Sequence, residues 1–123
     1  MRAALINRIT AQVPGLGGRV YQAFTAPAKK VPPYCTVKLP DIVGSGAITY
    51  AGTQRIEVRL YGPAGSFLLL DTLAAATIKA LNGHMVGGTL VQWAPGGGDF
   101  VEEDGELGRI LFFEAAALHA PAR

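Results

Sequence analysis

The chain has 123 residues, of which 50% are hydrophobic and only 16% charged, a composition that fits one globular domain with a modest core. No stretch reaches the roughly 18–20 consecutive apolar residues of a membrane-spanning helix. The single cysteine excludes an internal disulfide and a cysteine-based zinc cluster. We therefore expect one domain over residues 1–123, a cytoplasmic origin and no membrane partner.

The net charge of +2 conceals an uneven distribution along the chain. Residues 1–60 carry eight Lys or Arg against two Asp or Glu, a net of +6, whereas residues 61–123 carry three against seven, a net of −4. Solvation of two surfaces explains this split simply. The alternative is that opposite faces of one protomer are complementary, as a head-to-tail ring requires.

The N-terminal third predicts a helix followed by two short strands. Apolar residues recur at helical spacing at Leu5, Ile6, Ile9 and Val13, and the Pro- and Gly-rich run 14–18 ends the helix. The strands are expected at 19–24 and 34–39. In the second strand Cys35 falls on the apolar side of the alternation, which favours a core residue over a nucleophile.

Residues 41–52 are rich in glycine and show no clear hydrophobic period. We expect a long loop or a loose hairpin there. Loops of this length are usually functional or disordered.

Residues 53–82 contain the clearest pattern in the chain. Ile56, Val58 and Leu60 alternate with polar residues, which predicts a strand with one face on a core. The turn 62–65 follows, and Ser66 can cap a helix over 67–82. The apolar stripe of that helix comprises Leu69, Leu70, Leu73, Ala74, Thr77, Ile78 and Leu81, and Gly83 is expected just past its end.

The C-terminal part predicts a strand at 89–94, a flexible run at 95–99, an acidic turn at 102–106 and a last strand at 108–118. That last strand is apolar on both faces. One face carries Ile110 and Phe112, and the other carries Leu111, Phe113 and Ala115. It is therefore either central in the sheet or has its second face at an interface.

Candidate chemical sites are few. The turn Gly62–Ser66 precedes a helix N-terminus, where free N–H groups can bind phosphate, but it lacks a P-loop sequence and is explained as a capped turn. We expect His84 in a glycine-bounded turn and His119 in the C-terminal tail, and neither belongs to a triad or zinc motif. The acidic residues of 102–106 favour solvation of a loop over catalysis or metal binding. We expect no enzymatic activity, no metal and no cofactor.

Nucleic-acid recognition is also not indicated. The net charge is small and no module of interleaved aromatic and basic residues is present, so sequence-specific binding is not expected. Passive proximity to DNA in a channel is a different matter, because mobile acidic loops would prevent adhesion.

The order of elements resembles the small tail-terminator, or tail-completion, proteins of long-tailed bacteriophages and gene transfer agents, over nearly the whole chain. Three patterns carry the resemblance. They are Gly18-Arg-Val-Tyr21 after an N-terminal helix, Pro33-Tyr34 opening a strand, and the strand Arg55–Tyr61 feeding a helix of about four to five turns. The family has no catalytic residues to carry over.

The resemblance implies an α+β fold, with a small mixed, mainly antiparallel sheet of about four to five strands and two helices packed on one face. It implies a ring, usually a hexamer, that caps the head-proximal end of the tail tube, ends tube polymerisation and joins the head. The implied partners are further copies of the chain, the tail tube protein and a head-completion or connector protein. DNA would pass non-specifically through the lumen of a virion assembled in the bacterial host cytoplasm.

Two hypotheses concern contacts. First, Arg55, Glu57 and Arg59 lie at the subunit interface, where the arginines meet acidic residues of a neighbour, and Leu111 and Phe113 add an apolar contact. Second, the loops 41–52 or 96–106 dock on the tail tube or line the lumen. The acidic residues of these loops are Asp41, Asp99, Glu102, Glu103, Asp104 and Glu106.

Two alternatives remain at this stage. The nearer one is another ring protein of the same neck, with the same kind of role at a different position. The other is a small cytosolic ligand-binding or enzymatic domain that uses the Gly62–Ser66 turn. Stabilisation by phosphate or nucleotide would favour the second, because a ligand that binds only the folded state must stabilise it.

Overall fold

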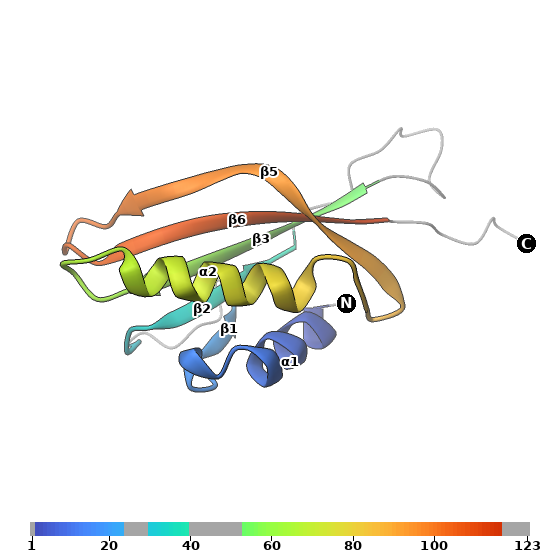
Figure 1. Ribbon diagram of the computed structural model, residues 1–123, viewed down its shortest axis with the longest axis horizontal. Helices are drawn as coiled ribbons and strands as arrows, with labels where there is room; N and C mark the ends of the chain where they lie inside the picture. The colour runs from blue at the N-terminus through green and yellow to red at the C-terminus, as the bar shows by residue number, and fades with distance from the viewer. Residues whose placement is uncertain (1, 24–29, 40–52, 117–123) are drawn as a thin grey trace, which may run out of the picture.

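The computed structural model describes residues 2–23, 30–39 and 53–116, and places two helices on one face of a curled six-stranded sheet (Figure 1). The elements in chain order are α1 (Arg2–Gln12), a 3₁₀ turn (Pro14–Leu16), β1 (Val20–Gln22), β2 (Tyr34–Lys38), β3 (Thr53–Gly62), α2 (Leu68–Leu81), β4 (His84–Val86), β5 (Thr89–Val101) and β6 (Leu107–Ala116). The expected loop at 41–52, with Asp41, lies outside the described residues. Within the described residues, neither helix is both long and apolar enough to cross a bilayer.

The strands are ordered β1-β2-β3-β6-β5-β4 across the sheet. Only β1 and β2 run parallel, and every other neighbouring pair is antiparallel. The α+β class and the mainly antiparallel sheet are therefore confirmed, although there are six strands rather than four or five. β6 lies between β3 and β5, so its two apolar faces belong to a central strand.

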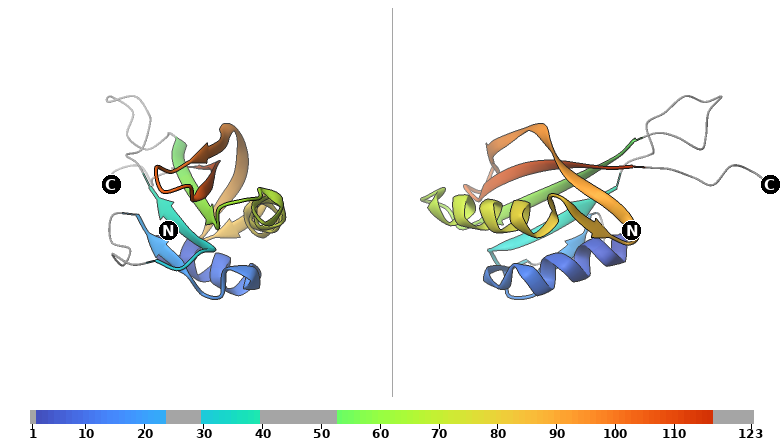
Figure 2. Two further views of the ribbon diagram at one scale, coloured as in Figure 1. Left: turned by 90° about the vertical axis from the view of Figure 1, so that its left-hand side faces the viewer. Right: turned by 45° about the vertical axis from the view of Figure 1, so that its right-hand side comes forward.

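The core lies between the helices and one face of the sheet, as the end-on view in Figure 2 shows. Ile56, Val58 and Leu60 of β3 are fully buried, which confirms the alternation read from the sequence. The helices contribute Leu5, Ile9 and Val13 from the N-terminal stretch, and Leu70, Leu73, Ala74, Thr77, Ala80 and Leu81 from α2. Leu69 differs from the expected stripe, because it is 38% exposed.

The start of α2 differs from the prediction, because the helix begins at Leu68 and Phe67, not Ser66, occupies the N-cap position. The Ser66 hydroxyl accepts a hydrogen bond from the Leu68 amide over 3.1 Å, so it satisfies one of the free donors at the helix start. After the helix, Gly83 has a φ of +76°, which glycine adopts without steric cost. Its amide then donates to the carbonyl of Val91 on β5 over 2.8 Å. The turn after α2 therefore leads directly into the sheet.

Two predictions for the segment after α2 were wrong. His84 lies in the short strand β4, not in a turn, and β4 is joined to β5 by Gly87 and Gly88. Both glycines have positive φ, +60° and +80°, as a two-residue type I′ hairpin requires. Likewise Pro95 and the three glycines after it do not form a flexible loop, because β5 continues through them to Val101.

The course of β5 has a steric explanation. The pairing with β6 shifts register between Ala94 and Gly98, which is a bulge. Gly97 has a φ of +82°, and a Cβ there would overlap the carbonyl oxygen of Ile110. Past Val91, β5 pairs with no other described strand on its second side, so a proline without an N–H is tolerated.

Candidate functional site

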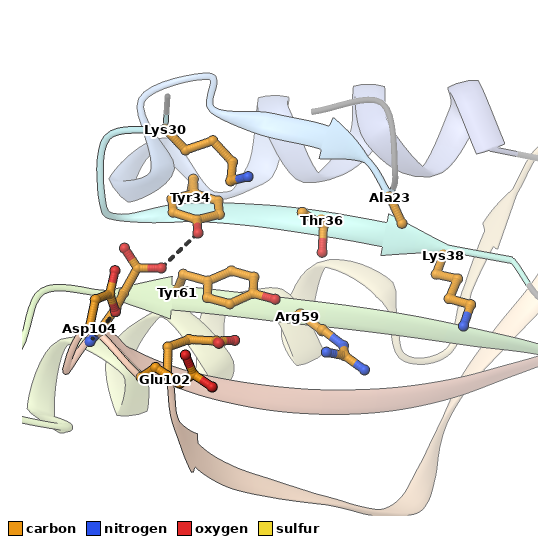
Figure 3. A pocket seen from close by; sticks show the side chains of 11 residues that line it. Ala23, Lys30, Tyr34, Thr36, Lys38, Arg59, Tyr61, Glu102 and Asp104 are labelled. Atoms are coloured by element: carbon orange, nitrogen blue, oxygen red, sulfur yellow. Dashed lines mark hydrogen bonds between the residues drawn. The ribbon is translucent and has the colours of Figure 1, made fainter. Parts of the chain in front are cut away.

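The sheet face opposite the helices is hollowed into an open trough of about 850 Å³ (Figure 3). Its lining comes from β2, β3, the segments next to β1 and β2, and the turn that joins β5 to β6. This face is free of helices because the alternating strands place their polar and aromatic side chains on it. The trough is therefore the surface on which the fold gathers its functional groups.

A row of aromatic rings crosses the open face of the sheet, and two of them, Tyr34 and Tyr61, line the trough. Tyr34 and Tyr61 are directly opposite each other on β2 and β3, and their rings stack with centroids 4.6 Å apart. Tyr21 lies 6.3 Å from Tyr34 on one side, and Phe100 meets Tyr61 edge-on at 5.6 Å on the other. Four strands thus contribute one ring each. The sequence pattern showed each ring but not that their registers bring them together.

Basic side chains lie over this aromatic row. The Lys30 ammonium is 5.7 Å from the centre of the Tyr34 ring, and the Arg59 guanidinium is 5.8 Å from that of Phe100. These are cation–π distances. Arg59 also donates from Nε to Glu57 Oε1 over 2.6 Å, and this hydrogen bond raises the pKa of the arginine. One side of the trough is therefore cationic.

The other side of the trough is the acidic turn 102–106. The turn closes on itself, because the Glu102 amide donates to the Glu106 carbonyl over 2.8 Å. The Glu106 amide in turn donates to Asp104 Oδ1 over 2.9 Å. The Tyr34 hydroxyl donates to Glu106 Oε1 over 2.7 Å, as drawn in Figure 3. Burial, followed by this hydrogen bond, raises the pKa of Tyr34 above its ordinary value. The turn is therefore hydrogen-bonded to the sheet.

The structure separates the residues that the first contact hypothesis grouped together. Arg55, Glu57 and Arg59 do lie on the open face, with Glu57 and Arg59 paired to each other. Leu111 and Phe113, in contrast, are 6% and 0% exposed and pack in the core with the helices. They are unavailable to another subunit, which corrects that part of the hypothesis.

The open side of β6 is formed instead by Ile110 and Phe112, which are partly exposed. The Arg55 guanidinium lies 5.1 Å from the centre of the Phe112 ring. The two faces of β6 were both apolar in sequence, so the pattern could not say which one meets the helices. Packing of α1 and α2 decides it.

The acidic residues of the second hypothesis also fall into two groups. Glu102, Glu103, Asp104 and Glu106 line the trough. Asp99 lies within β5 and accepts a hydrogen bond from Arg109 over 2.5 Å, so it belongs to the strand rather than to a loop. Asp41 lies outside the described residues.

The structure also places the groups that the sequence offered as candidates for chemistry. Among the described residues, no group of three or more His, Cys, Asp or Glu is arranged to hold a metal ion. Cys35 is fully buried, and burial raises the pKa of its thiol to about 12, so it is almost entirely protonated near neutral pH. The Ser66 hydroxyl at the candidate anion turn is already bonded to Leu68. An open trough with charges of both signs is suited to contact with another protein.

Two helices on one face of a six-stranded, mainly antiparallel sheet define the structural class. Solved structures that share this fold include two that cover nearly the whole chain. One is described as the virion of a native gene transfer agent particle: it is 20% identical, with a TM-score of 0.74 over 97% of this chain and 95% of that chain. A second is 17% identical, with a TM-score of 0.62 over 98% and 95% of the two chains.

At these identities the likeness shows a shared fold. No model of a protein family matches the sequence, and no curated protein does either.

Proposed function

We propose that the chain is a structural protein of a phage-like virion, and specifically a subunit of the ring that caps the head-proximal end of the tail tube. The observation that carries the proposal is the match of the complete fold to a chain of a gene transfer agent virion. The length agrees as well, because the match leaves little of either chain uncovered. The ring ends tube polymerisation and provides the surface to which the DNA-filled head is joined.

The form of the trough supports a role in assembly. It is open, it carries both cationic and anionic side chains, and its aromatic floor contains Tyr34 and Tyr61. Tyrosine and arginine are enriched in protein interfaces. We propose that the tail tube or the head-completion protein docks here, and that the acidic turn 102–106 takes part in the contact.

The proposal is tested on tubes assembled from the tail tube protein of the same phage or element. Purified chain is added during polymerisation, and tube lengths and ends are recorded by negative-stain electron microscopy. The expected result is arrested elongation with a ring at one end of each tube. Continued elongation with bare ends would refute the capping function.

A charge variant extends this test to the trough. Glu102→Lys combined with Glu103→Lys reverses two exposed acidic residues that line the trough. We expect the variant to stay folded and to lose capping. The matched control is Arg2→Glu, which reverses an exposed charge on α1, away from the trough, and should cap normally.

Another ring of the neck is the second candidate, because it would share the virion context and the need for a docking surface. Copurification separates the two. A terminator is recovered with tail tube proteins, whereas a head-completion or connector protein is recovered with the portal side of the head.

A further inference from the structure

Apolar side chains are exposed at both ends of α2 and β5. Exposed fractions are 63% for Met85, 41% for Leu90 and 51% for Trp93. They are 75% for Leu68, 38% for Leu69 and 63% for Val101. Met85 and Leu90 are opposite partners on β4 and β5, and Trp93 follows three residues later on the other face of β5. Large apolar side chains exposed at one end of a molecule mark a candidate contact surface. We call the first group the Trp93 end and the second group the acidic end.

The contacts in the structure place these groups at opposite ends. The Trp93 amide donates to Asn82 Oδ1 over 2.9 Å, which puts it beside the last turn of α2. Arg109 holds both Asp71, in the first turn of α2, and Asp99, near the end of β5. The two elements therefore run in opposite directions, as Figure 1 shows, and the length of α2 separates the two ends by about 20 Å.

The charges at the two ends are opposite. At the acidic end, the positive charge of Arg109 is offset by its two partners, Asp71 and Asp99. The turn that follows Val101 adds Glu102, Glu103 and Asp104, which line the adjoining trough. At the Trp93 end, Lys79 is exposed in the last turn of α2, and the Arg8 side chain donates from Nε to the Ala80 carbonyl over 2.5 Å. On the other sheet face there, Arg55 and Glu114 are opposite partners and offset each other.

We infer that the Trp93 end of one copy binds the acidic end of a second copy. Two different surfaces at opposite ends of one molecule make a heterologous, head-to-tail contact, which closes into a ring when the rotation between copies allows it. The apolar groups supply the buried centre of the contact, with Trp93 as its anchor, and Arg8 and Lys79 face the acids of the next copy. This inference rests on the proposed ring and names its contact surfaces.

The inference changes the assignment made from sequence alone. The +6/−4 split along the chain suggested that Arg55 and Arg59 face the acids of a neighbour. In the structure Arg59 already holds Glu57 within its own chain. The positive charge available at the Trp93 end comes from the helices instead, through Arg8 and Lys79.

The test compares the self-association of the full chain with that of Trp93→Ser. Sedimentation velocity across a dilution series gives the protein concentration at which half of the chains are assembled. The series is measured for the protein alone and in the presence of tail tubes. We expect Trp93→Ser to raise that concentration by about tenfold or more, because buried tryptophans often dominate an interface. The control is Val31→Ser, which removes an apolar side chain that is 59% exposed on the segment before β2, and it should assemble normally.

Exchanging two charges across the proposed contact distinguishes a lost interaction from a folding defect. Lys79→Glu should weaken assembly in a salt-dependent way, and adding Glu103→Lys to the same chain should restore it, at least in part. Circular dichroism confirms that each variant is folded. Assembly of Trp93→Ser at the wild-type concentration, or a wild-type chain that stays monomeric with and without tubes, would overturn the inference.

The same samples separate this contact from the proposed function. If the wild-type chain caps tubes and Trp93→Ser assembles and caps as well, the proposed function is supported and the proposed interface is wrong. If assembly depends on Trp93 but the wild-type chain caps no tube, the proposed interface is supported and the proposed function is wrong.

Discussion

The Nη2 atom of Arg109, on β6, lies 2.7 Å from Oδ1 of Asp71, in the first turn of α2. The Nε atom of the same side chain donates to Asp99 on β5 over 2.5 Å. These hydrogen bonds, chiefly the one to Asp99, raise the pKa of Arg109. One side chain therefore joins the long helix to two strands at the acidic end of the molecule.

Replacement of Arg109 by alanine tests that role. The arginine side chain is 17% exposed and its aspartate partners are about half exposed, so we expect a loss of about 1–2 kcal/mol in the free energy of unfolding. Urea denaturation measures it. The control Arg2→Ala, exposed on α1, should change stability by less than about 0.5 kcal/mol. Equal effects of the two substitutions would contradict the role.

Phe112 and Phe113 are neighbours in sequence with opposite surroundings. Phe113 is fully buried in the core, whereas Phe112 is partly exposed beneath the Arg55 guanidinium. Phe113→Ala should cost about 3–5 kcal/mol because it leaves a cavity. Phe112→Ala should cost about 1 kcal/mol, from lost packing and one cation–π contact. Thermal and urea unfolding of the two variants compare them directly, and the reverse order would refute the assignment of faces.

The position of the Phe100 ring leaves no room for a side chain at Gly108. A Cβ at position 108 would overlap that ring, which lies directly across the β5–β6 pair. Gly108→Ala should therefore cost about 1–3 kcal/mol through overpacking. In the double variant with Phe100→Ala, the alanine at 108 should add almost nothing, because the clash is gone. Additive costs in urea denaturation would show that the clash is not the cause.

The environment of the Tyr34 hydroxyl leads us to expect that the free energy of unfolding falls at alkaline pH. Its pKa is raised above the ordinary value of 10.0 by burial and by the hydrogen bond to Glu106. Below that ordinary value the phenol is protonated in both states, and its full contribution is present. Above it the unfolded chain releases a proton that the folded chain retains, so stability falls as the pH rises.

Urea midpoints measured from about pH 8 to pH 11 test this coupling. Tyr34→Phe should show a shallower decline, with a remainder from Tyr61, whose pKa is also raised by burial. Identical slopes for the two proteins would rule out the coupling through Tyr34.

Cys35 should be inert in the native protein. It is fully buried, and burial raises the pKa of its thiol to about 12. A thiol reagent such as dithionitrobenzoate should therefore react only as fast as the chain opens, and promptly in denaturant. Immediate reaction of the folded protein would place the residue at the surface.

Local periodicity in the sequence was enough to determine the class of fold. The alternation around Ile56, Val58 and Leu60, followed at once by a helical stripe, predicts a strand and the helix that covers it, because burial of one face imposes these periods. The same reasoning placed Cys35 in the core. Each of these features depends on residues close together in the chain.

Tertiary structure decided the course of β5 and the faces of β6. A proline and three glycines indicate a loop, yet β6 pairs with β5 on both sides of the bulge, and the glycines adopt the positive φ that the bulge needs. For β6, two apolar faces carry no local signal of which one the helices cover. Leu111 and Phe113 were therefore placed at an interface from sequence, whereas they lie in the core.

The trough, too, depends on registers that no single segment specifies. Tyr34 meets Tyr61, and Glu106 meets Tyr34, only because strand pairing brings β2, β3 and the start of β6 side by side. Likewise, Arg109 can hold both Asp71 and Asp99 only because the opposite directions of α2 and β5 bring the two aspartates to the same end. The sequence by itself determined which residues are apolar, charged or turn-forming, and the packing of distant segments decided which of them meet.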